Sequence, residues 1–173
     1  MPEIISDQQF IEFYDENIDK IYRFIYFRAP GKQEAQDLAS EVFLKAWQYI
    51  ADGNEVENLR ALLYQVARNA LTDYYRDKNR RALSLDEVRT ADDPKQNLVE
   101  NPESIIKVID DNLGLERIKK ALKNIKEEYQ EVIILRYLND YSLQEVAELM
   151  DKSYGAVRVL VNRSLRALKR ELL

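Results

Sequence analysis

Apolar residues recur at three- and four-residue spacing along most of this 173-residue chain. That spacing is the period of amphipathic α-helices, whereas strict alternation would indicate half-buried strands. Gly and Pro number only four each, too few for the many turns of an all-β protein. The sequence therefore predicts an all-α fold.

The N-terminal part of the chain contains the patterns of three helices. Ser6 and Gln9 form a capping box at the start of the first, which is broken by the Ala-Pro-Gly sequence at 29–31. The second helix is expected over residues 32–50 and the third over residues 58–81. Together they predict one small helical domain.

Residues 84–112 differ in character from the segments on either side. Asp, Glu, Asn and Pro are frequent there, and the apolar residues lose their strong periodicity. We interpret this stretch as an acidic linker. The predicted organisation is therefore two small helical domains, residues 1–83 and 113–173, joined by the linker at 84–112.

The C-terminal domain ends in two helices separated by the three-residue turn 151–153. Ser142 and Glu145 form a second capping box, and Ser153 is a suitable N-cap for the final helix. Two short helices joined by such a turn, the second one basic, are typical of a helix-turn-helix. The alternative is an ordinary helical hairpin with a basic face.

The exposed face predicted for the final helix carries side chains that suit a DNA major groove. An arginine can donate to guanine, an asparagine can pair with adenine, and a small apolar side chain can meet a thymine methyl group. The face carries Tyr154, Arg158, Val159, Asn162, Arg163 and Arg166. Other basic side chains further along the helix suit phosphates. This face is the candidate for reading a DNA sequence.

Positive charge is concentrated in two stretches although the chain has a net charge of −5. Residues 60–81 carry six bases and two acids, and residues 152–170 carry six bases and no acid. Binding to phosphates needs local positive charge rather than a basic chain. The two stretches therefore predict nucleic-acid binding, and solvated helix faces are the alternative explanation.

The chain contains neither Cys nor His. Disulfides, thiolate nucleophiles, imidazole acid–base chemistry and the usual zinc sites are thereby excluded. The Gly-Lys pair at 31–32 lacks the rest of a phosphate-binding loop. We expect no catalytic residue, no metal and no cofactor. Without a signal peptide or an apolar run of membrane-spanning length, we expect a cytoplasmic protein without membrane insertion.

Five blocks of the sequence resemble conserved regions of bacterial RNA polymerase sigma factors. Residues 37–47 and 62–76 resemble the second conserved region, and residues 129–138, 141–150 and 153–158 resemble the fourth. The linker leaves no room for the third-region domain of larger sigma factors, which points to the extracytoplasmic-function group of the sigma-70 superfamily. The resemblance implies a non-enzymatic subunit that binds core RNA polymerase, directs it to promoters and helps to melt DNA.

The resemblance also implies roles for individual positions. Binding to core polymerase is expected of Asp37, Glu41, Leu44, Lys45 and Trp47. Contact with the minus-10 element is expected of Arg60, Tyr64, Arg68, Asn69, Asp73, Arg76, Lys78, Arg80 and Arg81. Contact with the minus-35 element is expected of Ser142, Ser153, Tyr154, Ala156, Arg158, Val159, Asn162, Arg163 and Arg166. Core packing is the alternative role for Tyr64, and Trp47 could serve both roles.

The sequence departs from the family pattern on the final helix. Val159 and Leu160 stand where a polar and then a basic residue are usual, and Ala156 stands where Thr is common. A sigma-like protein that no longer reads promoters is therefore one alternative. A dimeric helix-turn-helix regulator is another, but it gives residues 37–47 no role. An anti-sigma protein is an expected partner, because factors of this group are usually held inactive by one.

Overall fold

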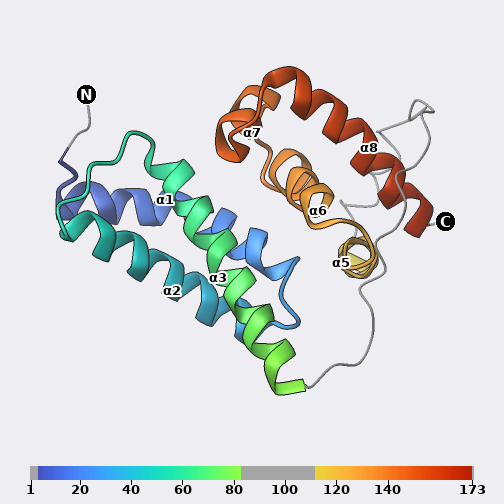
Figure 1. The fold of residues 1–173 in the computed structure, drawn as a ribbon, viewed down its shortest axis with the longest axis horizontal. Coiled ribbons are helices and arrows are strands. Elements are labelled where there is room, and N and C mark those ends of the chain that lie inside the picture. Colours follow the sequence, from blue (N-terminus) through green and yellow to red (C-terminus); the bar gives the residue numbers. More distant parts are fainter. Residues whose placement is uncertain (1–3, 83–111, 173) are drawn as a thin grey trace. The chain divides into compact units, whose positions relative to one another are not determined.

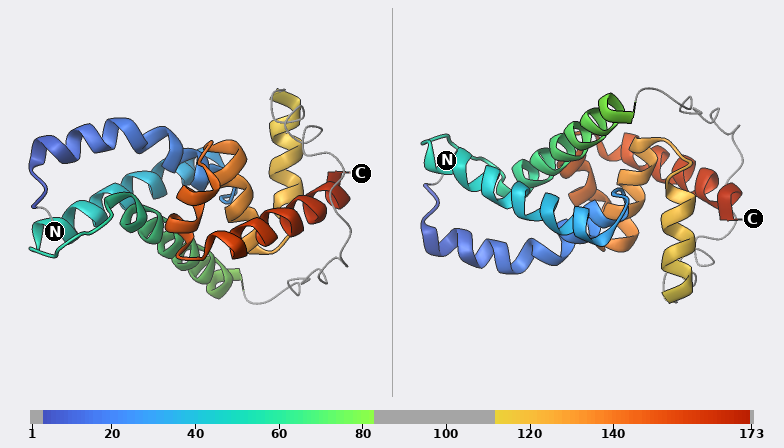
Figure 2. Two further views of the ribbon diagram at one scale, coloured as in Figure 1. Left: turned by 90° about the horizontal axis from the view of Figure 1, so that it is seen from above. Right: turned by 90° about the horizontal axis from the view of Figure 1, so that it is seen from below.

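The computed structural model describes residues 4–82 and 112–172, which form two separate helical units (Figures 1 and 2). Every element in these described ranges is helical, which confirms the all-α prediction. The expected linker lies outside the described residues except for Asn112, which begins a helix.

The first unit consists of α1 (Asp7–Tyr26), α2 (Lys32–Ala51) and α3 (Leu59–Ala82). The Ser6 hydroxyl accepts a hydrogen bond from the Gln9 amide, and the Gln9 side chain accepts one from the Ser6 amide. The predicted capping box is therefore present. In Figure 1, α2 lies alongside both α1 and α3, with which it makes most of the packing in this unit.

Aromatic and aliphatic side chains from all three helices fill the core of the first unit. Ile21, Phe24 and Leu63 are completely buried. Tyr64 is also 0% exposed, and its ring meets Phe24 edge to face with centroids 5.1 Å apart. A ring without solvent access cannot stack on a base. The expected contact between Tyr64 and the minus-10 element is therefore corrected, and its core role stands.

The second unit consists of α5 (Asn112–Leu122), α6 (Glu127–Ile133), the π-helical turn η1 (Ile134–Leu138), α7 (Leu143–Met150) and α8 (Tyr154–Leu172). Its core joins apolar side chains from each of these elements. The long helix α8 packs on α6, α5 and α7. The first helices of this unit thus form a support on which α8 rests.

The apolar pattern predicts one continuous helix from Tyr129 to Leu138, but the last turn is a π-helix. The Asn139 amide donates to the Ile134 carbonyl, five residues back, at 2.8 Å. The guanidinium of Arg136 donates to the Tyr141 carbonyl at 3.0 Å and holds the chain after this turn. The π-helix is wider than the α-helix that precedes it. At the junction of the two, the consecutive residues Ile133, Ile134 and Leu135 are all buried.

The turn between α7 and α8 has the expected features of a helix-turn-helix. Ser142 and Glu145 make both hydrogen bonds of the predicted capping box. Asp151 adopts a left-handed conformation with φ of 52°, which ends α7. The Ser153 hydroxyl accepts a hydrogen bond from the Ala156 amide at 3.1 Å, which caps α8 as predicted.

Candidate nucleic-acid interfaces

The buried side of α8 fixes which of its residues face solvent. The side chains packed against the rest of the unit are Val157, Leu160, Val161, Ser164, Leu165, Ala167 and Leu168. Leu160 thus faces the core. The absence of a basic residue at this position therefore does not remove a donor from the exposed face. Leu172, the last residue of α8, is only half-buried.

The exposed face of α8 brings together most of the side chains expected at the minus-35 element. Arg158, Asn162 and Arg163 are exposed, together with Tyr154 and Val159, which are 46% and 49% exposed. Within the described ranges, Arg158, Asn162 and Arg163 make no polar contact with another residue. Their donors are therefore available to a ligand.

The remaining minus-35 candidates differ in how much of their polar chemistry is already used. The hydroxyls of Ser142 and Ser153 both accept capping hydrogen bonds, although both residues are exposed. Ala156 is exposed. Arg166 is half-buried, and its Nε atom is buried without a hydrogen-bond partner among the described residues. A buried donor atom in this state is satisfied by water or by an acceptor from outside the chain.

The last turn of α8 adds the bases Lys169 and Arg170. Cations at this end of a helix interact favourably with its dipole. The turn before α8 contains Lys152, whose Nζ atom lies 2.7 Å from an oxygen of Glu128 on α6. Positive charge therefore runs along the exposed side of α8, and one of its cations is paired with an acid.

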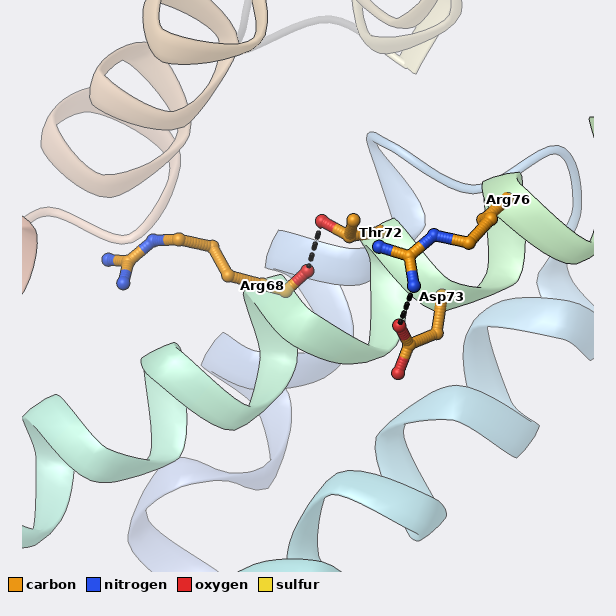
Figure 3. Close-up of polar contacts among 4 residues, drawn as sticks. All are labelled: Arg68, Thr72, Asp73 and Arg76. Carbon is orange, nitrogen blue, oxygen red and sulfur yellow. Dashed lines mark hydrogen bonds and ion pairs between the residues drawn. The ribbon is translucent and has the colours of Figure 1, made fainter.

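The second candidate interface lies on α3 (Figure 3). The Thr72 hydroxyl donates to the Arg68 carbonyl at 3.0 Å, and Arg76 lies 3.8 Å from the Asp73 carboxylate. Figure 3 shows the guanidinium of Arg76 turned toward Asp73, while that of Arg68 extends away from these residues. Asp73 thus offsets part of the positive charge of this face.

Asn69 is exposed on the same helix and takes part in a short chain of hydrogen bonds. Its side-chain oxygen accepts from the Gln65 amide group at 3.1 Å, and Gln65 accepts from Arg68 at 3.0 Å. Gln65 is not among the residues predicted at the minus-10 element. Its spacing of three residues from Arg68 and four from Asn69 could have indicated these contacts, because side chains at such spacings are neighbours on a helix.

The other bases expected at the minus-10 element extend along α3. Arg60 is half-buried near its start and Lys78 is exposed near its end. The side chains of Arg80 and Arg81 lie outside the described part of the chain, although their backbone belongs to α3. The described bases and amides of α3 are thus spread over several turns, and the bases of α8 likewise extend from Arg158 to Arg170 in its last turn.

The candidate polymerase-binding face lies on α2. Asp37, Glu41, Leu44 and Lys45 are exposed, and the Leu44 side chain is 56% exposed. Lys45 pairs with Glu41 at 2.7 Å, and this hydrogen-bonded carboxylate raises the pKa of the lysine. Trp47 is half-buried, and its ring centroid lies 5.0 Å from that of Phe10. An exposed leucine among charged groups can bind a partner that offers both apolar and charged side chains.

Residues 4–82 and 112–172 also bear on metal binding and membrane insertion. No group of acidic side chains in those ranges is arranged to hold a metal ion. None of the helices there is both long and apolar enough to cross a membrane.

Two family models match the two helical units. The model for sigma-70 region 2 matches residues 13–81, and the model for sigma-70, region 4 matches residues 115–168. The chain therefore belongs to the sigma-70 family of RNA polymerase sigma factors. Its similarity to named extracytoplasmic-function factors assigns it to that group of the family.

Two of these relatives show how far the similarity extends. The ECF RNA polymerase sigma factor BldN of Streptomyces coelicolor is 33% identical over 94% of this chain, which spans 60% of BldN. The factor SigM of Bacillus subtilis is 26% identical, with 91% of each protein covered. The chain thus corresponds to three fifths of one relative and nearly the whole of the other.

A solved structure supports the fold. The sigma factor RpoE from Bartonella quintana, in complex with the anti-sigma factor NepR, matches with a TM-score of 0.65 and 20% identity. The match covers 95% of this chain and 97% of that one. The arrangement of helices described above is thus one that a solved sigma factor adopts.

Proposed function

We propose that this chain is a sigma subunit that directs core RNA polymerase to promoters through a minus-35 and a minus-10 element. The observation that carries the proposal is the exposed face of α8, where Arg158, Asn162 and Arg163 have no polar partner among the described residues. The two guanidinium groups and the Asn162 amide can donate hydrogen bonds to acceptors on base edges in the major groove. The helix-turn-helix turn supports the same role.

The two faces of the first unit complete this proposal. The α2 face with Leu44 docks on core polymerase, and the α3 face holds the minus-10 strand. Asn69 lies where we propose that a base flipped from the duplex is bound. Flipping a base costs a few kcal/mol, which stacking and electrostatic contacts must offset. Arg68, Arg76 and Lys78 hold the backbone.

The proposal extends to where the protein acts and what restrains it. It acts in the cytoplasm, where polymerase and promoters are, and as a binding subunit rather than an enzyme. We further propose an anti-sigma protein as its inhibitor, since RpoE of Bartonella quintana has been solved with one. Recovery of polymerase subunits alone from unstressed cells would contradict this last point.

Reconstitution tests the proposed function directly. The purified chain is mixed with sigma-free bacterial core polymerase and a library of promoter fragments, and the transcripts are sequenced. We expect discrete start sites with a shared upstream motif. A stable complex without transcripts would support the alternative of a sigma-like protein that no longer reads promoters. Tight binding to duplex DNA without polymerase would support the stand-alone regulator.

A pair of variants on α2 separates polymerase binding from folding. Leu44→Asp places a charge at the exposed leucine and should reduce affinity for core polymerase without a loss of helix content. Tyr49→Asp is the matched control, because Tyr49 is 43% exposed on the same helix and points about 140° around the helix axis from Leu44. Equal loss in both variants would argue against a specific role for the Leu44 face.

A further inference from the structure

Val159 is an apolar side chain in the middle of the charged, exposed face of α8. It is 49% exposed, although it belongs to a residue type that is usually buried. At 100° per residue, its direction lies well away from the arc of α8 that packs on the core. The fold therefore gives this side chain no packing role that would explain its presence.

Polar side chains that are free to bind a ligand surround Val159 on the same face. Arg158 is its neighbour in sequence, and Asn162 and Arg163 follow one turn later. None of the three has a polar partner among the described residues. Whatever meets these donors must also meet the isopropyl group of Val159.

The surface next to Val159 leaves room for a close approach. Side chains on a helix lean toward its N-terminus, so Val159 leans over Gly155, one turn earlier. A Cβ atom added at Gly155 would meet no other atom within 4 Å, so the space there is open. The edge of a flat ring can therefore reach the Val159 methyl groups without a clash.

Val159 also borders a hollow between α6 and α8. Its lining includes the cations Lys126, Lys152 and Arg163 as well as the apolar Ala156. Glu128 contributes the one carboxylate of that lining. The excess of positive charge around this apolar surface favours a ligand with phosphates over an apolar segment of a protein.

The chemistry of the major groove leaves one match for such a side chain. Base edges there present hydrogen-bond donors, acceptors and a single apolar group, the C5-methyl of thymine. Valine has no donor or acceptor, so covering a polar base edge would remove water without replacing its hydrogen bonds. Only the thymine methyl gains from this contact.

We propose that Val159 is a specificity-determining residue that contacts the C5-methyl group of a thymine in the minus-35 element. This inference rests on the proposed function, and it names the base that residue 159 of α8 recognises. The residue that replaces a polar group of the family pattern thus reads a base by its methyl group. The promoters of this protein carry a thymine at the corresponding position.

Uracil substitution tests this contact because it removes the methyl group alone. Holoenzyme is assembled on a promoter obtained by reconstitution, and each minus-35 thymine is replaced in turn by deoxyuridine. Loss of one buried methyl group should weaken binding by about three- to fivefold at a single position. Val159→Ala should bind the thymine promoter more weakly and lose most of this discrimination, whereas Val159→Ile should keep it.

Arg158→Ala is the matched control, since it alters the same face but should keep the preference for thymine over uracil. Equal discrimination by the wild type and Val159→Ala at every position would overturn the inference. So would weaker binding of Val159→Ala to core polymerase with unchanged discrimination, which would indicate a protein-binding role. In both cases promoter-directed initiation by the wild type would leave the proposed function intact. An absence of initiation would contradict the function itself.

Discussion

At the scale of single residues, the two candidate DNA-binding helices differ in how far their side chains are already engaged. Arg158 and Asn162 on α8 have no polar partner among the described residues. On α3, Asn69 accepts a hydrogen bond from Gln65, and Arg76 lies near Asp73. The α8 donors can bind at once, whereas the α3 side chains must exchange local contacts for DNA.

Asn69 should matter more for opening the promoter than for binding polymerase. Asn69→Ala removes the group proposed to receive a flipped base, so we expect slower opening with unchanged affinity for core polymerase. A fluorescent base analogue in the minus-10 element reports opening, and competition for core reports binding. Gln65→Ala, which removes only the neighbour of Asn69, is the control. Normal opening by Asn69→Ala with intact core binding would contradict this role.

Two arginines of α8 should differ in what their loss does. Arg158 lies in the first turns and Arg170 in the last. If Arg158 reads a base, Arg158→Ala should cost about 1–3 kcal/mol and relax the preference at one base pair. Arg170→Ala should weaken binding about equally for all sequences. Binding of each variant to promoters changed at single positions measures both effects, and a uniform loss for Arg158→Ala would make it a phosphate contact.

At the scale of helices, the sequence predicted the elements well because their signals are local. Both capping boxes and the Ser153 cap appear as expected, since each needs only residues three positions apart. The π-helical turn after Ile133 was not predicted, because its signature is a hydrogen-bond pattern and not a change of apolar spacing. Burial of Leu160 likewise depends on how α8 rotates against α6, which the period of α8 alone does not decide.

The sequence predicted which residues form the candidate sites more readily than it predicted the contacts that these residues make. The exposed groups of α8 followed from the face opposite its apolar stripe, whereas those of α2 were predicted from the resemblance to sigma factors. For Tyr64 the sequence left both core and DNA open, and its complete burial against Phe24 decides for the core. Gln65 was missed because an uncharged amide gives no charge signal.

The capping box of α7 allows its structural and DNA-binding roles to be separated. Ser142→Ala removes the acceptor for the Glu145 amide and should cost about 1 kcal/mol of stability. Ser142→Asp keeps an acceptor, so it should retain stability but weaken promoter binding through its negative charge. Thermal unfolding followed by circular dichroism measures the first effect and promoter binding the second. If both variants lost stability equally, the cap would not be the main role of this hydroxyl.

At the scale of the whole molecule, the chain combines a net charge of −5 with faces that are locally basic. Acidic and basic stretches alternate along the sequence. The net charge of the chain and the local charge of one face therefore predict different effects on DNA binding. Binding to DNA should follow the local charge, because salt screens charges more than about 10 Å apart at 0.1 M.

Two double variants with the same change in net charge can test this. Lys169→Gln with Arg170→Gln removes two positive charges from the last turn of α8, and Lys120→Gln with Lys123→Gln removes two from the α5 end of the same unit. Each phosphate contact contributes about 0.9 to the slope of log affinity against log salt. The α8 variant should therefore reduce the slope for promoter binding by about 2. The α5 variant should leave the slope nearly unchanged. Equal reductions in both would mean that net charge, and not the exposed face of α8, governs binding.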